Sequence, residues 1–197
     1  MQEKIKSQIK SSIELKQKLL ESTEIISGIE NAAKAIISAF RNKNKLLLAG
    51  NGGSAADAQH IAAEFVNRFG FDRPALPSVA LSTDTSVLTS IGNDSGFEKI
   101  FSRQIQALGN EGDVFIGIST SGTSENIIRA LNTCRTNKTV TIGLTGIFGG
   151  PMKDLCDICI KVPSDETPRI QEAHNLIGHI ICSLVEEELF NRGNPEK

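Results

Sequence analysis

The sequence has no apolar run that approaches the roughly 18 residues of a membrane-spanning helix. Its first six residues, Met-Gln-Glu-Lys-Ile-Lys, are too polar to begin a secretory signal. The 197-residue chain has only four cysteines, which is typical of reduced thiols rather than of a disulfide framework. We therefore expect a cytoplasmic protein with no membrane segment.

The chain also lacks an excess of charge of either sign. Its 21 basic and 23 acidic side chains leave a formal charge of −2, which argues against broad nucleic-acid binding because such binding needs a basic surface. Hydrophobic residues make up 39% of the sequence and charged residues 22%, as in ordinary globular proteins. A chain of this length can form one sizeable domain that needs no disulfide or structural metal.

The first 43 residues contain no proline and a single glycine, Gly28. Isoleucines recur every fourth residue over 5–13, and a second apolar set follows over 29–40. This spacing predicts two amphipathic helices, or one helix with a break near Gly28. We interpret residues 1–43 as a helical extension for oligomerisation and residues 44–197 as the main domain. The spacing leaves open whether the extension packs on this domain or on another subunit.

From residue 45 onward, short apolar runs alternate with polar turns and helical patterns. The apolar runs predict five strands, at 46–49, 78–81, 113–118, 139–144 and 158–162. Helical patterns follow the first glycine-rich turn to about residue 67 and occupy 97–108, 124–136 and 169–191, whereas 82–94 is interpreted as a loop. Apolar strands that alternate with helices are typical of a parallel sheet covered on both faces. Right-handed crossovers then give an α/β fold, a doubly wound five-stranded sheet in a flavodoxin-like three-layer sandwich.

Ligands of such a fold bind beyond the carboxyl ends of the strands, where two unusual loops lie. The first has the sequence Gly50-Asn51-Gly52-Gly53-Ser54 and joins a strand to a helix. Its glycines allow the backbone to approach a ligand, and the N–H groups of the helix can bind an anion. The loop lacks the Lys-Ser/Thr pair of a P-loop. It fits a dinucleotide fingerprint only loosely, because the first acid after the second strand, Asp84, lies 34 residues beyond Gly50 rather than about 20. We expect no nucleotide cofactor.

The second loop, residues 119–124, contains three serines and two threonines in six positions. Hydroxyl groups at the start of a helix can donate several hydrogen bonds to a phosphate. The alternative is that Ser124 caps the helix and the other hydroxyls satisfy a turn, but capping alone requires one hydroxyl rather than five. The loop therefore favours a phosphate site.

Two helices carry further polar side chains at helical spacing. His60 and Glu64 are four residues apart, so they share a face and can form either an exposed ion pair or half of a metal site. Spacing alone favours the exposed pair. On the last helix His179 lies eight residues after Gln171 and seven after Glu172, so periodicity does not choose between these two partners.

Four segments in order resemble sugar isomerase (SIS) domains, namely 50–60, 91–94, 118–122 and 169–172. The last of these, together with His179 eight residues after Gln171, narrows the resemblance to the phosphoheptose isomerase family. The resemblance runs from about Lys45 to Phe190. It implies an aldose–ketose isomerase that converts sedoheptulose 7-phosphate to D-glycero-D-manno-heptose 7-phosphate by enediol proton transfer. This reaction is the first step of bacterial heptose synthesis for surface polysaccharide such as lipopolysaccharide or capsule.

The resemblance also implies roles for individual residues. Glu64 would be the general base, and His179 its acid partner. Some members of the family carry zinc, and the matching ligands here are His60, Glu64, Gln171 and His179. The family consists of homotetramers with sites between subunits, so that His179 of another chain could face His60 and Glu64. The residues matched to substrate binding are Asn51, Gly52, Gly53, Ser54, Asn93, Asp94, Ser119, Thr120, Ser121, Ser124 and Gln171.

Two other functions compete with this interpretation. One relative with the same fold binds the bacterial replication initiator without catalysis, and other relatives isomerise sugar phosphates of a different length. A binding protein has no need of His60, Glu64, Gln171 and His179 together, so we favour an enzyme. In that enzyme a base would move the carbon-bound proton, and a second group would handle the proton on oxygen. The loop 82–94 would set the length of the sugar.

Overall fold

The structure, a computed structural model, describes residues 1–190. Five strands form one sheet in the order β2-β1-β3-β4-β5, and every neighbouring pair is parallel. The strands are β1 (Leu46–Gly50), β2 (Ser78–Ala80), β3 (Val114–Ser119), β4 (Val140–Thr145) and β5 (Ile158–Lys161). The predicted doubly wound α/β sheet is confirmed.

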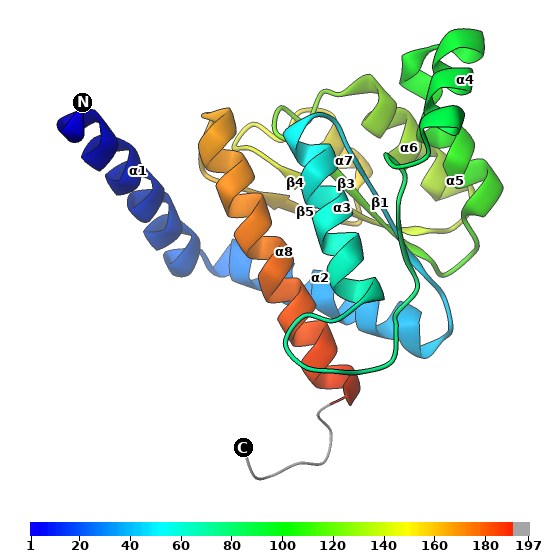
Figure 1. Cartoon of the computed structure of the whole chain (residues 1–197), viewed down its shortest axis with the longest axis horizontal. Coiled ribbons are helices and arrows are strands. Elements are labelled where there is room, and N and C mark those ends of the chain that lie inside the picture. The colour runs from blue at the N-terminus through cyan, green and yellow to red at the C-terminus, as the bar shows by residue number, and fades with distance from the viewer. Residues whose placement is uncertain (191–197) are drawn as a thin grey trace.

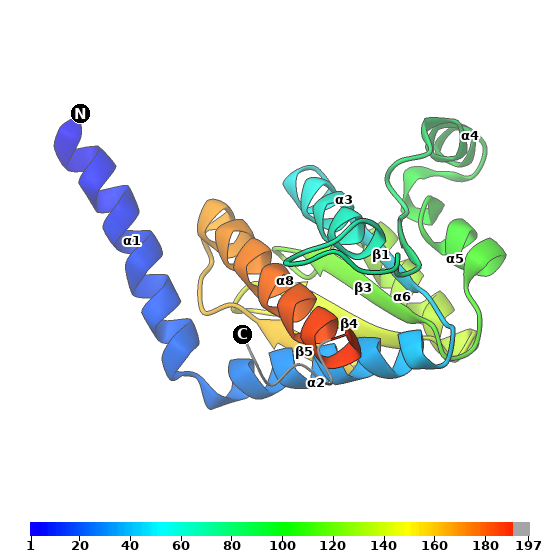
Figure 2. The ribbon, with the colours of Figure 1, turned by 60° about the horizontal axis from the view of Figure 1, so that its bottom comes forward.

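Helices cover both faces of this sheet (Figures 1 and 2). They are α1 (Gln2–Glu21), α2 (Thr23–Arg41), α3 (Gly53–Val66), α4 (Thr85–Ser95), α5 (Ser102–Leu108), α6 (Glu125–Thr136), α7 (Met152–Leu155) and α8 (Thr167–Phe190), with a 3-10 turn η1 at Phe97–Lys99. Two differences from the sequence-based prediction stand out. The predicted loop 82–94 contains helix α4, which Asp84 caps by accepting a hydrogen bond from Val87 N at 3.0 Å. The predicted helix 97–108 is divided into η1 and α5, and residue 191 of the predicted last helix lies outside the described residues.

The alternation of side chains along each strand builds two separate cores. Leu46 and Leu48 of β1 pack with α2, α3 and α8, whereas Leu47 and Ala49 pack with α5, α6 and α7. All four side chains are fully buried. A parallel sheet between two helical layers needs apolar groups on both faces. Each strand is therefore a continuous apolar run in the sequence.

The N-terminal region forms two helices, but the break lies at Ser22 rather than near Gly28. Ser22 ends α1 and caps α2, with its Oγ accepting a hydrogen bond from Ile25 N at 3.3 Å. Gly28 lies inside α2, where an added Cβ would be 3.1 Å from Ile160 Cγ1 of β5. The glycine therefore allows α2 to lie close to the sheet, and it does not interrupt the helix.

Helices α1 and α2 differ in what they bury. Helix α2 shares the core of α3 and α8, whereas α1 projects from the body in both views (Figures 1 and 2). The side chains of Ile5, Ile9 and Ile13 on α1 remain 53%, 56% and 51% exposed. The domain boundary at residue 43 stays a prediction, although α2 belongs to the same hydrophobic core as the sheet. No helix in residues 1–190 has both the length and the hydropathy to cross a membrane.

Candidate functional site

Helices α3 and α8 lie side by side on one face of the sheet and run in the same direction (Figures 1 and 2). Gly178 of α8 faces Ile61 of α3, and a Cβ added at Gly178 would be 2.7 Å from Ile61 Cδ1. The absence of a side chain at this position therefore lets the two helices approach closely. The polar residues of both helices meet along the resulting seam.

Two histidines from different helices meet at this seam. His60 Nε2 of α3 lies 2.8 Å from His179 Nε2 of α8, and His60 Nε2 lies 3.4 Å from Glu64 Oε1. The side chain of His60 is 45% exposed and that of Glu64 is 23% exposed, so the group is open to solvent. The expectation that His179 of another chain faces His60 is wrong, because the fold brings the two together within one chain.

The cluster fits a metal ion. The ligand atoms of His60, Glu64 and His179 lie within 4.8 Å of one another. Imidazole nitrogens and a carboxylate oxygen around a tetrahedral zinc ion, at about 2.1 Å from it, would be about 3.4 Å apart. The exposed His–Glu pair that spacing alone favoured is therefore joined by a third ligand group. The geometry permits both metal binding and proton transfer.

Gln171 lies at the other end of the seam. Its Nε2 is 2.5 Å from the position that a Cβ on Gly53 would take, so its amide covers the start of α3. By helix geometry Gly53 is about two turns from His60. The predicted role of Gln171 as a metal ligand stays a prediction, and the position of its amide suits contact with a ligand at the start of α3.

The hydroxyl-rich segment 119–124 folds into a compact loop between β3 and α6. Ser119 Oγ lies 2.9 Å from Ser124 Oγ, and Ser121 Oγ lies 2.8 Å from Thr123 Oγ1. Gly122 has a φ of +68°, and a Cβ there would be 2.1 Å from Gly149 O, so the turn requires glycine.

Ser124 occupies the N-cap position of α6, but its side chain makes no cap hydrogen bond. The first part of the alternative, that this hydroxyl caps α6, is therefore wrong. The second part is confirmed for two hydroxyls, because Ser119 Oγ accepts a hydrogen bond from Gly122 N and Ser121 Oγ accepts one from Thr123 N, both at 3.2 Å. The N–H groups at the start of α6 keep their capacity to bind an anion.

The glycine-rich loop and the hydroxyl-rich loop lie beside each other. Strands β1 and β3 are neighbours, with Gly50 aligned to Ile118, so the loops that follow them share one edge of the sheet. The side-chain amides of Asn51 and Asn126 join the loops through two hydrogen bonds of 2.9 Å. Ser54 is buried at the start of α3. Sequence reasoning missed Asn126, although its place in the first turn of α6 was a usable signal.

Asn93 and Asp94 do not join the cluster around His60 and His179 within this chain. Both residues are exposed on α4, and Asn93 Nδ2 donates a hydrogen bond to Asp94 Oδ1 at 2.8 Å. Helix α4 lies at the end of the molecule away from α8 in both views (Figures 1 and 2). Their predicted contact with the sugar stays a prediction.

Two residues near the cluster were missed by sequence reasoning. Asp57 lies on the same face of α3 as His60 and Glu64, at helical spacing that could have revealed it. Burial raises the pKa of Asp57, against the opposing effects of the Asn175 amide and the His60 imidazole. Phe69 lies in the loop after α3, with its ring centroid 5.4 Å from that of His179. Because Phe69 lies in a loop, no helical or strand periodicity in the sequence marks it as a site residue.

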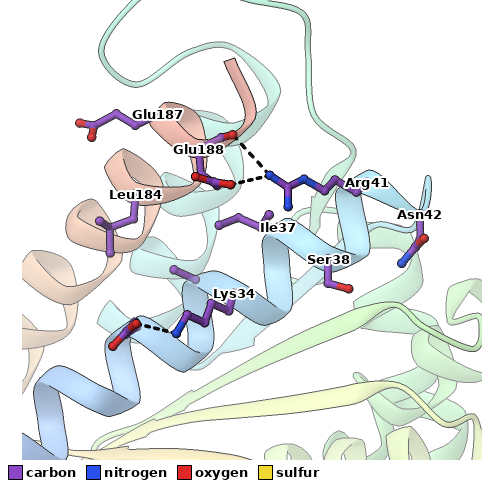
Figure 3. A pocket seen from close by; sticks show the side chains of 10 residues that line it. Lys34, Ile37, Ser38, Arg41, Asn42, Leu184, Glu187 and Glu188 are labelled. Atoms are coloured by element: carbon purple, nitrogen blue, oxygen red, sulfur yellow. Dashed lines mark hydrogen bonds and ion pairs between the residues drawn. The ribbon is translucent and has the colours of Figure 1, made fainter. Parts of the chain in front are cut away.

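A hollow lies on the opposite flank of α8. The groove between α2 and α8 has a volume of about 850 Å³ and is lined by Ile37, Arg41, Leu184 and Glu188 among others (Figure 3). None of the predicted site residues lines it. The predicted chemistry therefore lies on the α3 side of α8.

Comparison with known proteins gives a consistent result. The model of the SIS domain family matches residues 9–146. Phosphoheptose isomerase of Aneurinibacillus thermoaerophilus is 63% identical over 190 residues, which cover 96% of each chain. Phosphoheptose isomerase 2 of Campylobacter jejuni is 61% identical over 189 residues, which cover 96% of this chain and 94% of that protein.

Solved structures of similar proteins agree in fold. The structure of a phosphoheptose isomerase from Francisella tularensis has a TM-score of 0.90 at 40% identity, and the alignment covers 94% of this chain and 97% of that one. The corresponding structure from Neisseria gonorrhoeae has a TM-score of 0.88 at 42% identity and covers 94% and 98%. A more distant structure, of a protein from E. coli, is only 19% identical at a TM-score of 0.67 and shows the shared fold alone.

Proposed function

Because this chain belongs to the SIS domain family and, within it, to the phosphoheptose isomerases, we propose that it converts sedoheptulose 7-phosphate to D-glycero-D-manno-heptose 7-phosphate. The observation that carries this proposal is the convergence of His60, Glu64 and His179 at the seam of α3 and α8. Such a cluster supplies a base and an acid at one place, as an aldose–ketose isomerisation requires. The enzyme acts in bacterial heptose synthesis.

The two loops at the edge of the sheet anchor the phosphate of the substrate. Ser119, Thr120, Ser121 and Ser124 present hydroxyl groups beside the uncapped start of α6. The Ser54 side chain and the glycines at the start of α3 lie at the same edge, although the Ser54 N–H itself donates to Asn51 O at 3.0 Å. Backbone N–H groups and hydroxyls can hold a dianion without a cationic side chain.

The proton-transfer groups lie further along α3. From Gly53 to His60 the helix rises by about 10 Å, which is comparable to the length of a seven-carbon sugar phosphate in extended form. Substrate held by its phosphate at the start of α3 therefore places its first two carbons near Glu64 and His179. Asn51, Gly52, Gly53 and Gln171 line the path between the two ends.

The reaction moves one proton from C1 to C2 of the sugar and a second proton from the oxygen on C1 to the oxygen on C2. The Glu64 carboxylate removes a proton from C1 of the ketose, while the His179 imidazolium gives a proton to the carbonyl oxygen at C2. The resulting enediol takes a proton at C2 from Glu64 and loses the O1 proton to His179, which yields the aldose and restores both groups. Proton transfer by positioned groups of this kind contributes about 10²–10⁴ in rate.

Zinc is the metal that the ligand set favours, since two imidazoles and a carboxylate match its preferences. His60, Glu64 and His179 would hold it, with Gln171 as the fourth predicted ligand. A carboxylate or imidazole nitrogen that binds zinc is not free to take up or give a proton, so the zinc-bound state and the proton-transfer state described above are alternatives for Glu64 and His179. When bound, zinc acts as a Lewis acid that polarises the carbonyl group and stabilises negative charge on the enediol oxygens.

We also propose that the chain assembles as a homotetramer with its sites at subunit interfaces. The exposed stripe of Ile5, Ile9 and Ile13 on α1 supports an intersubunit contact, because it has no partner within residues 1–190 that would bury it. Asn93 and Asp94 would then reach the sugar from a neighbouring subunit. The cytoplasmic location remains a prediction from the cysteine content.

The test is direct assay of the purified protein with sedoheptulose 7-phosphate, with product followed by NMR. We expect conversion by the natural sequence and a loss of about 10²–10⁴ in kcat for Glu64→Gln, with an unchanged circular dichroism spectrum. Glu188→Gln, a substitution of the same kind outside the site, serves as the matched control. Full turnover by Glu64→Gln would disprove the assignment of the base.

A substrate panel separates the competing functions. Ketose phosphates of five and six carbons, assayed with and without a chelator, decide whether the site prefers seven carbons. A higher kcat/KM for a shorter sugar would replace the proposed substrate. No turnover of any sugar, together with capture of a replication initiator protein, would favour the binding role, which the names of the relatives do not support.

A further inference from the structure

A buried carboxylate on α8 holds the loop that follows α3. Glu186 accepts hydrogen bonds from three successive backbone N–H groups, those of Phe69 at 2.9 Å, Gly70 at 2.6 Å and Phe71 at 3.2 Å. It also pairs with Arg73, whose Nε lies 2.7 Å from Glu186 Oε2. The side chains of Arg73 and Glu186 are only 1% and 2% exposed. Burial acts to raise the pKa of Glu186, but these hydrogen bonds outweigh it and leave the pKa lowered.

Arg73 connects this carboxylate to the end of α3. Its Nη2 donates to Glu64 O at 2.8 Å, and its Nη1 donates to Phe65 O at 2.7 Å. The last carbonyl groups of a helix lack partners within the helix, so the guanidinium group completes the hydrogen bonding of the final turn. That turn carries Glu64, the proposed base.

The same loop places an aromatic ring on the second proposed catalytic group. Phe69, whose N–H donates to Glu186, has its ring centroid 5.4 Å from the His179 ring at an angle of 49°. Glu186 lies seven residues after His179, about two turns along the same face of α8. One buried carboxylate therefore links the helix of His179, the ring packed on His179 and the helix end that carries Glu64.

Stability alone is a poor explanation for this arrangement. A buried ion pair gives little net stability, because removing two charges from water costs about as much as their attraction returns. Apolar packing could hold a surface loop equally well. Arg73 and Glu186 do more than hold the loop, because their hydrogen bonds set the loop against particular atoms of the site. A fixed geometry is valuable there, since a displacement of about 1 Å can reduce a rate by about a hundredfold.

We propose that Glu186 and Arg73 are positioning residues for the isomerisation, fixing Phe69 against the His179 imidazole and the Glu64 end of α3 against α8. This inference rests on the proposed function for its kinetic part. It assigns no contact with the substrate to either residue. Phe69 forms an apolar wall that limits the orientations of the imidazole and its access to water.

The experiment compares two glutamates on one helix. Glu186→Gln keeps the shape of the side chain but removes its charge, whereas the matched control Glu188→Gln removes a charge that pairs with Arg41 away from the site. At a temperature where circular dichroism shows both variants fully folded, we expect kcat to fall about tenfold or more for Glu186→Gln. KM should change little, because the phosphate loops are untouched, and Glu188→Gln should match the natural sequence in both constants.

Two further variants cover the possibility that Glu186→Gln does not fold. Arg73→Lys keeps the charge but loses the fork that reaches Glu64 O and Phe65 O, and Phe69→Leu removes the ring and keeps apolar volume. We expect both variants to lower kcat while KM remains near that of the natural sequence. Unchanged kcat in the folded protein for both variants would overturn the inference.

A readout independent of turnover comes from the histidines. The chain has only three, so NMR signals of His60, His174 and His179 can be assigned with single His→Asn variants. We expect the His179 ring signals to shift in Glu186→Gln and Phe69→Leu, while those of buried His174 stay in place. Unmoved His179 signals would overturn the positioning role. If the natural sequence fails to convert the sugar, the proposed function fails, and the NMR comparison still decides this inference.

Discussion

The two flanks of helix α8 carry different sets of polar side chains. On the α2 side the charges are paired within the groove, as in Lys34 with Glu30 and Arg41 with Glu188 at 2.6 Å (Figure 3). On the α3 side the imidazoles of His60 and His179 meet from separate helices, and the Glu64 carboxylate of α3 lies beside His60. Among residues 1–190, Asp57 Oδ2 on that side is buried without a hydrogen-bond partner.

This contrast indicates which observations identify a site. The α2 groove is a hollow of about 850 Å³, but exposed ion pairs along a helix are ordinary surface chemistry and contribute little energy. The α3 seam gathers groups that can bind metal or transfer protons. Convergence of reactive groups, and not the volume of a hollow, therefore locates the candidate site in this chain.

The largest difference expected between the two flanks is in the stabilisation of the protein by added zinc. Zinc at about 100 times its dissociation constant should raise the free energy of unfolding by about 2.7 kcal/mol in the natural sequence. His60→Asn should lose this increment because it removes one of three ligands, whereas Glu188→Gln on the other flank should keep it. Thermal unfolding with added zinc and with a chelator measures both. An equal increment in His60→Asn would place any bound zinc elsewhere.

A second prediction concerns two glycines that allow close packing, Gly178 of α8 against α3 and Gly28 of α2 against strand β5. Gly178→Ala adds a Cβ that meets Ile61, so we expect overpacking of about 1–3 kcal/mol, offset in part by about 1 kcal/mol of helix propensity. Activity should fall because α3 and α8 move apart and separate His60 from His179. Chemical denaturation and kcat on the same sample measure the two effects.

The matched control for this substitution is Gly28→Ala on α2. Its added Cβ would lie 3.1 Å from Ile160 Cγ1, a milder contact that the gain in helix propensity can offset. We expect a change in stability within about 1 kcal/mol and no change in kcat. A loss of activity in Gly28→Ala equal to that in Gly178→Ala would show that the α3 seam has no special sensitivity.

The smallest effect is expected for the exposed ion pair of the α2 groove. Arg41→Gln should cost less than about 1 kcal/mol, since both side chains of the Arg41–Glu188 pair are more than one-third exposed and screened by water. In about 1 M salt the difference from the natural sequence should shrink further. Urea denaturation at two salt concentrations tests this. A cost above about 2 kcal/mol would mean that the α2 groove is less ordinary than the comparison suggests.

Much of the fold could be predicted because the apolar patterns are local. Each strand from Leu46 onward is a run of apolar residues followed by a polar turn, and all five appear within about one residue of their predicted bounds. Helix α4 could not be predicted in the same way. It contains no fully buried residue, and only Leu88 and Ile91 pack against the core, so its apolar face is too short for a sequence pattern to detect.

The break between α1 and α2 was misplaced for a related reason. A glycine is a common break in a helix, but Gly28 is required by the close approach of Ile160, a residue more than 130 positions away. Its role depends on a tertiary contact that no local pattern records. Ser22, a normal N-cap residue, was the correct local signal.

The amino-acid sequence by itself determined the order of the strands and helices and the residue types at the ends of the strands, because hydrophobic period and turn chemistry act over a few residues. Only the tertiary structure decided which of those residues meet. Spacing could not tell an exposed His60–Glu64 pair from half of a metal site, and the packing of α3 on α8 brought His179 to 2.8 Å from His60. The link from Glu186 through Arg73 to Glu64 was equally invisible in the sequence, because it joins residues more than 100 positions apart through a loop with no periodicity.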